Sequence, residues 1–313
     1  VLLIGTLNRV MIVELGVPSW IVAVMLALPL VFAPFRTFIG FRSDHHRSVL
    51  GWRRVPYIWF GTMAQFGGLA IMPFALLLLS GDTTQPMWVG EVGAAIAFLL
   101  VGAGLHTVQT VGLALATDLA PERARPRVVA LLWAMLLLGM ALSAVLFGLL
   151  LRDFSELRLI KVIQGAAAVT MIVNVIALWK QEPRGRAETK VRARDPSFAE
   201  SWARFASGGN AVRRLVAIGL GTMAFSMEDV LLEPYGGQVL GLAVGDTTKL
   251  TAALAIGGLF GFALASVVLS RGFDPFRMAA LGALLGVPAF SAVIAAGPLN
   301  SALLFGAGTA VIG

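Results

Sequence analysis

The sequence has no cysteine and very little charge, and each shortage excludes a class of protein. Without cysteine, the 313-residue chain can form neither disulfides nor thiolate metal sites. Only 13% of its residues are charged and 58% are hydrophobic, whereas soluble domains have roughly 25% charged residues. The chain has no phosphate-binding glycine loop, zinc-protease motif or nucleophile elbow, and its loops leave no room for a soluble catalytic domain. An enzyme is therefore not expected.

Long apolar runs recur along the chain and predict an all-α polytopic membrane protein, because about 20 apolar residues cross a bilayer as a helix. The first run opens at Val1 without a charged leader and the last ends at Gly313, so both ends look like truncations within spans. The expected spans are a shortened first one ending near 14–18, then 19–39, 56–79, 88–116, 128–151, 159–179, 212–232, 247–269, 276–296 and a tenth from about 299.

The net charge of +7 would suggest a nucleic acid partner in a soluble protein. Here, however, the cations fall almost entirely on one side of the predicted spans. The other side receives only Arg152, Arg158, Lys161 and Lys249. By the positive-inside rule the cation-rich side is cytoplasmic, and the N-terminus lies on that side too. The charge then meets an anionic membrane surface, and no nucleic acid partner is expected.

A polar stretch after the sixth span divides the chain into residues 1–180 with six spans, a linker of residues 181–211, and residues 212–313. Within the linker, Ser197 and Glu200 have the spacing of a helix capping box. Phe198, Trp202 and Phe205 then fall on one helical face. This pattern predicts a short helix that lies on the membrane surface.

Residues 40–57, which read GFRSDHHRSVLGWRRVPY, form the most polar short segment of the first part. Gly40 permits close packing of a helix end, Asp44 can form ion pairs there, and Arg53 and Arg54 hold the loop on the cytoplasmic face. The segment resembles the signature between the second and third spans of major facilitator transporters, although residues 45–50 lengthen the gap between Asp44 and Gly51. A weaker form of the pattern after the eighth span is consistent with two related halves.

Continued to residue 61, the string GWRRVPYIWFG is similar to the PucC and LhaA family, a branch of that superfamily associated with bacteriochlorophyll delivery and light-harvesting antenna assembly in purple bacteria. The resemblance covers essentially the whole chain. It implies two six-helix halves, incompletely covered here, in the inner (intracytoplasmic photosynthetic) membrane. It implies bacteriochlorophyll as the ligand, with carotenoid or lipid as further candidates. It also implies antenna α and β polypeptides as partners, with the reaction centre–core antenna complex as a further candidate.

A second cytoplasmic loop follows the fourth span, where residues 117–123 read TDLAPER. It resembles the equivalent transporter loop, which implies that Asp118 pairs with loop arginines and controls the packing between spans. The predicted gating or packing loop thus consists of Gly40, Asp44, Arg53, Arg54, Asp118 and Arg123.

Two groups of ionisable residues fall within predicted spans, where charge is costly and usually paired. Arg9 and Glu14 lie in the first span, and Glu228, Asp229 and Glu233 lie in the seventh. Since these spans face one another in the fold that the resemblance implies, we expect Arg9 to pair with Asp229 or Glu228. The cluster could couple proton or substrate movement, form a static bridge between the halves, or place Glu14 and Glu233 at the periplasmic interface. A bridge or interface is favoured, because antenna assembly requires no obvious ion gradient.

His106 is expected near the middle of the bilayer, because it lies 12 residues, or roughly 18 Å, before Asp118. Its imidazole could bind the magnesium of a bacteriochlorophyll, or it could be a hydrogen-bonded packing residue. Gly102 and Gly104 leave room either for a flat ring or for a neighbouring helix. Gln109, one turn further on, could bond to a ring carbonyl or to another helix. No other metal site is expected.

Three functions remain as hypotheses. The favoured one is a non-enzymatic assembly factor that binds bacteriochlorophyll and delivers it to antenna polypeptides. The alternative is a secondary transporter of a small solute or proton-coupled substrate, which would rock about Arg9 and the acidic cluster. The third is a structural scaffold without pigment.

Overall fold

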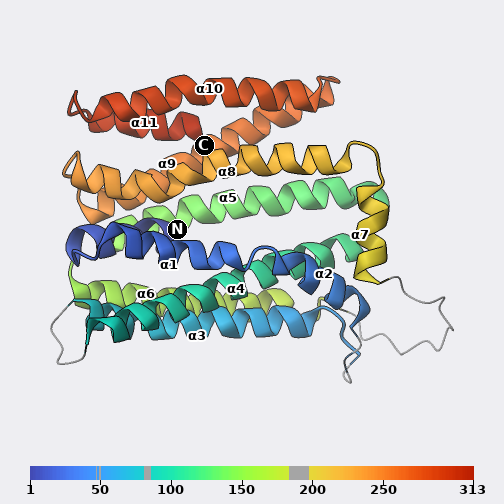
Figure 1. Cartoon of the computed structure of the whole chain (residues 1–313), viewed down its shortest axis with the longest axis horizontal. Helices are drawn as coiled ribbons and strands as arrows, with labels where there is room; N and C mark the ends of the chain where they lie inside the picture. Colours follow the sequence, from blue (N-terminus) through green and yellow to red (C-terminus); the bar gives the residue numbers. More distant parts are fainter. Residues whose placement is uncertain (47, 49–50, 81–85, 183–196) are drawn as a thin grey trace.

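The computed structural model describes residues 1–46, 48, 51–80, 86–182 and 197–313, and every regular element in these ranges is a helix (Figure 1). The side chains of residues 45, 126, 224–229 and 270 lie outside this description. The elements are η1 (Leu2–Leu7), η2 (Val10–Glu14), α1 (Ser19–Val31), α2 (Phe35–His45), α3 (Val55–Leu79), α4 (Met87–Leu119), η3 (Glu122–Ala124), α5 (Arg125–Leu150), α6 (Glu156–Leu178), α7 (Phe198–Ala206), α8 (Ala211–Gln238), α9 (Val244–Ser270), α10 (Pro275–Ala296) and α11 (Ala302–Ile312). The all-α prediction is confirmed.

Seven stretches of the described chain are long and apolar enough to cross a membrane, so the protein is a multi-pass membrane protein. They are α1 and α2 taken together, α3, α4, α5 with η3, α6, α9 and α10. The predicted seventh span corresponds to α8, in which the side chains of residues 224–229 lie outside the description, so this span stays a prediction. The first segment, η1 with η2, is outside this set, and α11 is apolar but shorter.

The predicted span boundaries agree with most helices to within a few residues, but the second span differs. The expected helix over residues 19–39 is divided into α1 and α2 by a turn at residues 32–34. Pro29 and Pro34 explain the break, because proline removes a backbone donor and disfavours helix in the residue before it. The next helix, α3, begins at Val55 with Pro56 in its first turn, where the missing N–H costs nothing.

Glycines bring neighbouring helices into backbone contact. A Cβ added at Gly61 of α3 would lie 3.0 Å from the Gly104 carbonyl oxygen of α4. On α5, a Cβ at Gly148 would lie 2.8 Å from the Gly245 carbonyl oxygen of α9. Close approach of this kind holds helices together in lipid, where the hydrophobic effect no longer favours their association. The fully buried core side chains near the first segment, α3, α4 and α6 include Leu7, Met72, Phe98 and Ile163.

The long helices lie roughly side by side (Figure 1). Figure 1 shows α3, α4 and α6 on one side of the bundle and α8 to α11 on the other. Between them α5 packs extensively against α9. The division into two six-helix halves stays a prediction.

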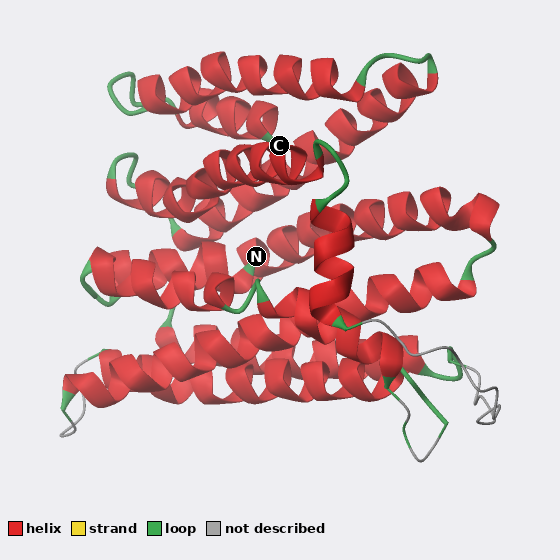
Figure 2. Cartoon of the chain, turned by 45° about the vertical axis from the view of Figure 1, so that its right-hand side comes forward, coloured by secondary structure: helices red, strands yellow, loops and turns green. Residues whose placement is uncertain are grey.

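The linker helix predicted from the capping box is present as α7, which crosses the ends of the long helices (Figures 1 and 2). The Ser197 hydroxyl accepts from the Glu200 N–H at 3.2 Å, and the Glu200 carboxylate accepts from the Ser197 N–H at 2.8 Å. The Phe198 ring contacts Phe41 of α2, with 5.9 Å between ring centroids. Trp202 is 48% exposed. The other predicted linker residues at 183–196 lie outside the described residues.

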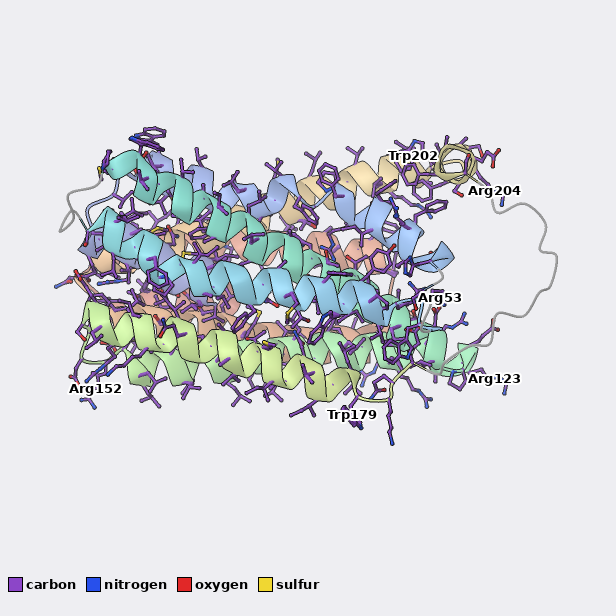
Figure 3. All side chains as sticks on the ribbon, turned by 90° about the horizontal axis from the view of Figure 1, so that it is seen from below. Arg53, Arg123, Arg152, Trp179, Trp202 and Arg204 are labelled. Carbon is purple, nitrogen blue, oxygen red and sulfur yellow. The ribbon has the colours of Figure 1, made fainter. Side chains whose placement is uncertain are left out.

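Cationic side chains gather at one end of the helices. Figure 3 shows Arg53, Arg123 and Arg204 at one end and Arg152 at the opposite end. The separation agrees with the one expected from the sequence. The membrane face that each end meets stays a prediction.

Candidate functional site

The residues predicted around the loop between the second and third spans converge on the guanidinium of Arg54. Its side chain is only 6% exposed, although it lies just before α3 at the cation-rich end. Its Nε lies 2.7 Å from Oδ2 of Asp118 on α4, and its Nη2 lies 2.7 Å from Oδ1 of Asp44 on α2. Nη1 donates to the Ser43 hydroxyl at 3.1 Å, and Arg53 also pairs with Asp118. One arginine therefore joins α2, α3 and α4.

The two other residues of the predicted loop lie differently. The Gly40 carbonyl accepts from the Ser43 hydroxyl at 2.8 Å and so supports a residue that holds Arg54. Arg123 in η3 is exposed and makes no contact with Asp118 among the described residues. The structure thus gathers Gly40, Asp44, Arg53, Arg54 and Asp118, and it leaves Arg123 outside this network.

Glu182, which sequence analysis missed, binds the N-terminus of α3. Its Oε1 accepts from the backbone N–H of Arg53 at 2.9 Å, and its Oε2 accepts from that of Val55 at 2.9 Å. The Arg54 N–H lies within 3.1 Å of both carboxylate oxygens. A helix start leaves such donors unsatisfied and favours a nearby negative charge. Because Glu182 follows α6 and lies 127 positions from Val55, no local sequence pattern could have revealed this contact.

Arg9 is buried in the first segment, and its described acidic partner belongs to that same segment. Its Nη1 lies 2.6 Å from Oε1 of Glu14, and its Nη2 donates to the Leu242 carbonyl at 2.9 Å. The segment is built from the two π-helical turns η1 and η2, a rare geometry that often occurs at functional positions. The side chains of Glu228 and Asp229 lie outside the described residues, so the expected pairing of Arg9 with either one stays a prediction.

Glu233 on α8 is buried against the first segment and is only 2% exposed. Its Oε1 accepts from the Thr251 hydroxyl of α9 at 2.8 Å. It also lies directly against Gly5, where an added Cβ would overlap the carboxylate. Two further hydrogen bonds join the first segment to α9 and α8, between Thr6 and Thr248 at 3.2 Å and from the Asn8 amide to the Val230 carbonyl at 2.5 Å. Glu233 is therefore enclosed by η1, α8 and α9, and its expected place at the periplasmic interface stays a prediction.

His106 on α4 faces the junction of α1 and α2. A Cβ added at Gly102, one turn earlier, would lie 2.6 Å from the Pro29 Cα, and Gly104 lies equally close to α3. Of the two expected uses of these glycines, close helix packing is the one that the structure contains. The imidazole lies beside the Pro29 carbonyl and within electrostatic range of Arg36. Its Nδ1 is buried without a hydrogen-bond partner among the described residues, so it retains the chemistry of a metal ligand.

Gln109 has different surroundings, because it lines a cavity of about 450 Å³ between α2, α3, α4, α5 and α6. His106 does not line this cavity, so the two residues predicted to bind pigment do not share one pocket. A mainly apolar hollow of about 910 Å³ lies between the start of α3 and the end of α6, where Trp59, Phe60 and Trp179 line it. Both volumes lie within the roughly 300–1,000 Å³ of ligand pockets.

Comparison with known proteins identifies relatives along the whole chain. The family model described as PUCC protein matches residues 6–313. Protein PucC of Rhodovulum sulfidophilum is 60% identical over 100% of this chain and 70% of its own length, and Protein PucC of Cereibacter sphaeroides is 55% identical over 100% and 69%. The bacteriochlorophyll synthase 44.5 kDa chain of Rhodobacter capsulatus is 27% identical over 86% of this chain and 61% of its own length. Because the family model matches nearly the whole chain and the two PucC relatives are 55–60% identical over all of it, the chain belongs to the PUCC protein family.

Proposed function

We propose that this protein assists the assembly of light-harvesting antenna complexes by binding bacteriochlorophyll and delivering it to antenna polypeptides. The observation that carries the proposal is membership of the PUCC protein family over residues 6–313, for which the sequence resemblance implies this role. The likeness to a relative named as a bacteriochlorophyll synthase chain supports a connection with this pigment. The role is non-enzymatic, since delivery requires no covalent bond of the pigment to be made or broken.

In this proposal the pigment is cargo held around α4. Because the two residues do not share one pocket, they are two candidate contact points: His106 would supply a ring nitrogen to the central magnesium, and the Gln109 amide, in its own cavity, would bond to a ring carbonyl. The buried Nδ1 of His106, which lacks a described partner, supports the first role. The cavity beside Gln109 supports the second. Carotenoid or lipid are further candidate cargoes for the same apolar surroundings.

The proposed recipients are antenna α and β polypeptides, with the reaction centre–core antenna complex as a further partner. A single-span helix can dock in lipid against a broad helix face, and α5 and α6 expose large apolar side chains on such faces. The proposed location is the inner (intracytoplasmic photosynthetic) membrane, with the N-terminus in the cytoplasm. The separation of cations between the two ends of the helices supports this orientation.

One observation favours a second candidate function, a secondary transporter of a small solute or proton-coupled substrate. Arg9 and Glu233 are buried where the first segment meets α8 and α9, and buried ionisable residues in membrane proteins often form substrate or proton pathways. In an assembly factor the same residues would form a static bridge. Solute flux into proteoliposomes that Glu233→Gln abolishes would support transport, whereas partner binding without flux would support the bridge.

The proposed function is tested by purifying the tagged protein from a purple bacterium in mild detergent. We expect antenna polypeptides and extractable bacteriochlorophyll to copurify with it. Antenna polypeptides without pigment would contradict delivery and leave a scaffold. Recovery of neither pigment nor antenna polypeptides would contradict the proposal as a whole.

A further inference from the structure

The cavity beside Gln109 contains a cation that no described acidic side chain neutralises. Arg36 on α2 lines this cavity, and its Nε donates to the Thr110 hydroxyl of α4 at 3.0 Å. That hydrogen bond holds the guanidinium in place. It leaves Nη1 and Nη2 without a hydrogen-bond partner among the described residues.

Three acidic side chains at this end of the bundle have other partners. Asp44 and Asp118 both pair with Arg54. Glu182 accepts the backbone N–H groups at the start of α3. Because charged groups within a membrane are usually paired, the position of Arg36 favours an anion that the described part of the chain does not supply.

The rest of the cavity wall combines amides with apolar surface. Gln109, Asn174 and Gln181 line it, and Asn174 is oriented by a 3.3 Å hydrogen bond from its Nδ2 to the Thr62 hydroxyl. Trp133 of α5 contributes apolar wall. Gly112 of α4 also lines the cavity, and apart from its own helix backbone no described atom lies within 4 Å of where its Cβ would be.

We propose that this cavity binds an amphiphile with a single carboxylate head, such as a fatty acid, and that Arg36 holds the carboxylate. A planar guanidinium with two available terminal nitrogens matches a carboxylate in bidentate geometry. The volume of about 450 Å³ suits one acyl chain rather than the two of a phospholipid. The amides and Trp133 complete a pocket of the usual kind, mostly apolar with a few convergent polar groups. The proposal does not rest on pigment delivery, although Gln109 belongs to both sites.

The test is photo-crosslinking of the full chain in phosphatidylcholine nanodiscs with three probes that carry the same diazirine acyl chain. The probes are a palmitate, the corresponding alcohol, and a phosphatidylglycerol. We expect the palmitate to label residues 132–136 about tenfold more than the alcohol, the scale of one charge-assisted hydrogen bond. Equal labelling by acid and alcohol would overturn the proposal, and so would stronger labelling by the phosphatidylglycerol.

Variants of the lining connect the labelling to the cavity. Arg36→Gln should abolish the preference for acid over alcohol, and Arg36→Lys should retain part of it. Gly112→Leu should fill the cavity and reduce labelling by both probes. Gly165→Leu on α6 is the matched control, because its Cβ position is equally open but lies outside the cavity lining. A preference that persists in Arg36→Gln would overturn the proposal, and the pigment content of the same samples reports separately on delivery.

Discussion

Arg54 and Asp118 meet through a 2.7 Å contact between Nε and Oδ2, which joins the start of α3 to the end of α4. The same guanidinium reaches Asp44 on α2, and its side chain is largely removed from solvent. Because it has three described partners, Arg54 holds α2, α3 and α4 together. Its neighbour Arg53 shares Asp118 but is much more exposed, so the two adjacent arginines should contribute unequally to stability.

We therefore expect Arg54→Gln to destabilise the protein by about 2–3 kcal/mol, the scale of hydrogen bonds to charged groups around a buried side chain. Arg53→Gln is the matched control and should cost about 1 kcal/mol or less, because exposed ion pairs contribute little. The measurement is the midpoint of unfolding of each variant in mixed detergent–SDS micelles. Equal losses for the two variants would contradict the assignment of Arg54 as the central residue.

Glu182 should protect the first backbone amides of α3 from exchange with solvent. We expect Glu182→Ala to cost about 1 kcal/mol, as the loss of a helix N-cap does, and to accelerate hydrogen exchange at residues 53–55. Glu182→Gln should have an intermediate effect, since it keeps an acceptor oxygen but not the charge. Glu122→Gln, at an exposed acid of η3, serves as the control. Unchanged exchange in Glu182→Ala would show that the carboxylate does not hold this helix end.

Gly102 should not tolerate a side chain, because α1 occupies the space beside it. We expect Gly102→Ala to destabilise by about 1–3 kcal/mol, the usual cost of overpacking, since the new methyl group would meet Pro29. Gly112→Ala on the same helix should be neutral or stabilising, because its Cβ position is open and alanine favours helix. Unfolding midpoints of the two variants compare the sites directly. An unchanged unfolding midpoint for Gly102→Ala would mean that α1 does not pack against Gly102.

The contact between Gly5 and Glu233 predicts an energetic coupling across the interface of η1 and α8. Gly5→Ala alone should cost about 1–3 kcal/mol, because the added methyl group would displace the buried carboxylate from the Thr251 hydroxyl that it accepts from. Combined with Glu233→Ala, which removes that carboxylate, it should cost much less. A double-mutant cycle on unfolding free energies measures the coupling. The control is Gly219→Ala, at an open position on α8, which should show no coupling with Glu233→Ala. Purely additive losses of unfolding free energy for the Gly5 and Glu233 variants would refute the contact.

Features determined by neighbouring residues could be predicted from the sequence. The long apolar runs predict the helices to within a few residues in most cases, and Pro56 marks the start of α3. The capping-box spacing of Ser197 and Glu200 correctly predicts α7. In each case the physical cause lies within one or two helical turns of its effect. The pairing of Asp118 with loop arginines was also predicted correctly. That prediction came from the family resemblance, because spacing alone does not show that the two loops lie together.

Features determined by tertiary packing were missed or left open. Glu182 binds amides far away in the sequence, so no local pattern identifies it. The space beside Gly102 is filled by Pro29 of α1, a residue far away in the sequence. The pairing of Arg9 with Glu14 joins residues five apart, which a regular α-helix places on different faces. Wider π-helical turns in that segment make the contact possible, and their occurrence could not be read from composition.

The central claim, that the protein carries bacteriochlorophyll, is tested most directly by an absorption spectrum of the purified protein with pigment extraction. The native protein is compared with His106→Ala. The control is His46→Ala, because His46 lies at the end of α2 and not on α4. We predict bacteriochlorophyll absorption in the native protein and in His46→Ala, and its loss in His106→Ala. Pigment retained by His106→Ala would contradict the ligand assignment, and a colourless native protein would contradict pigment delivery itself.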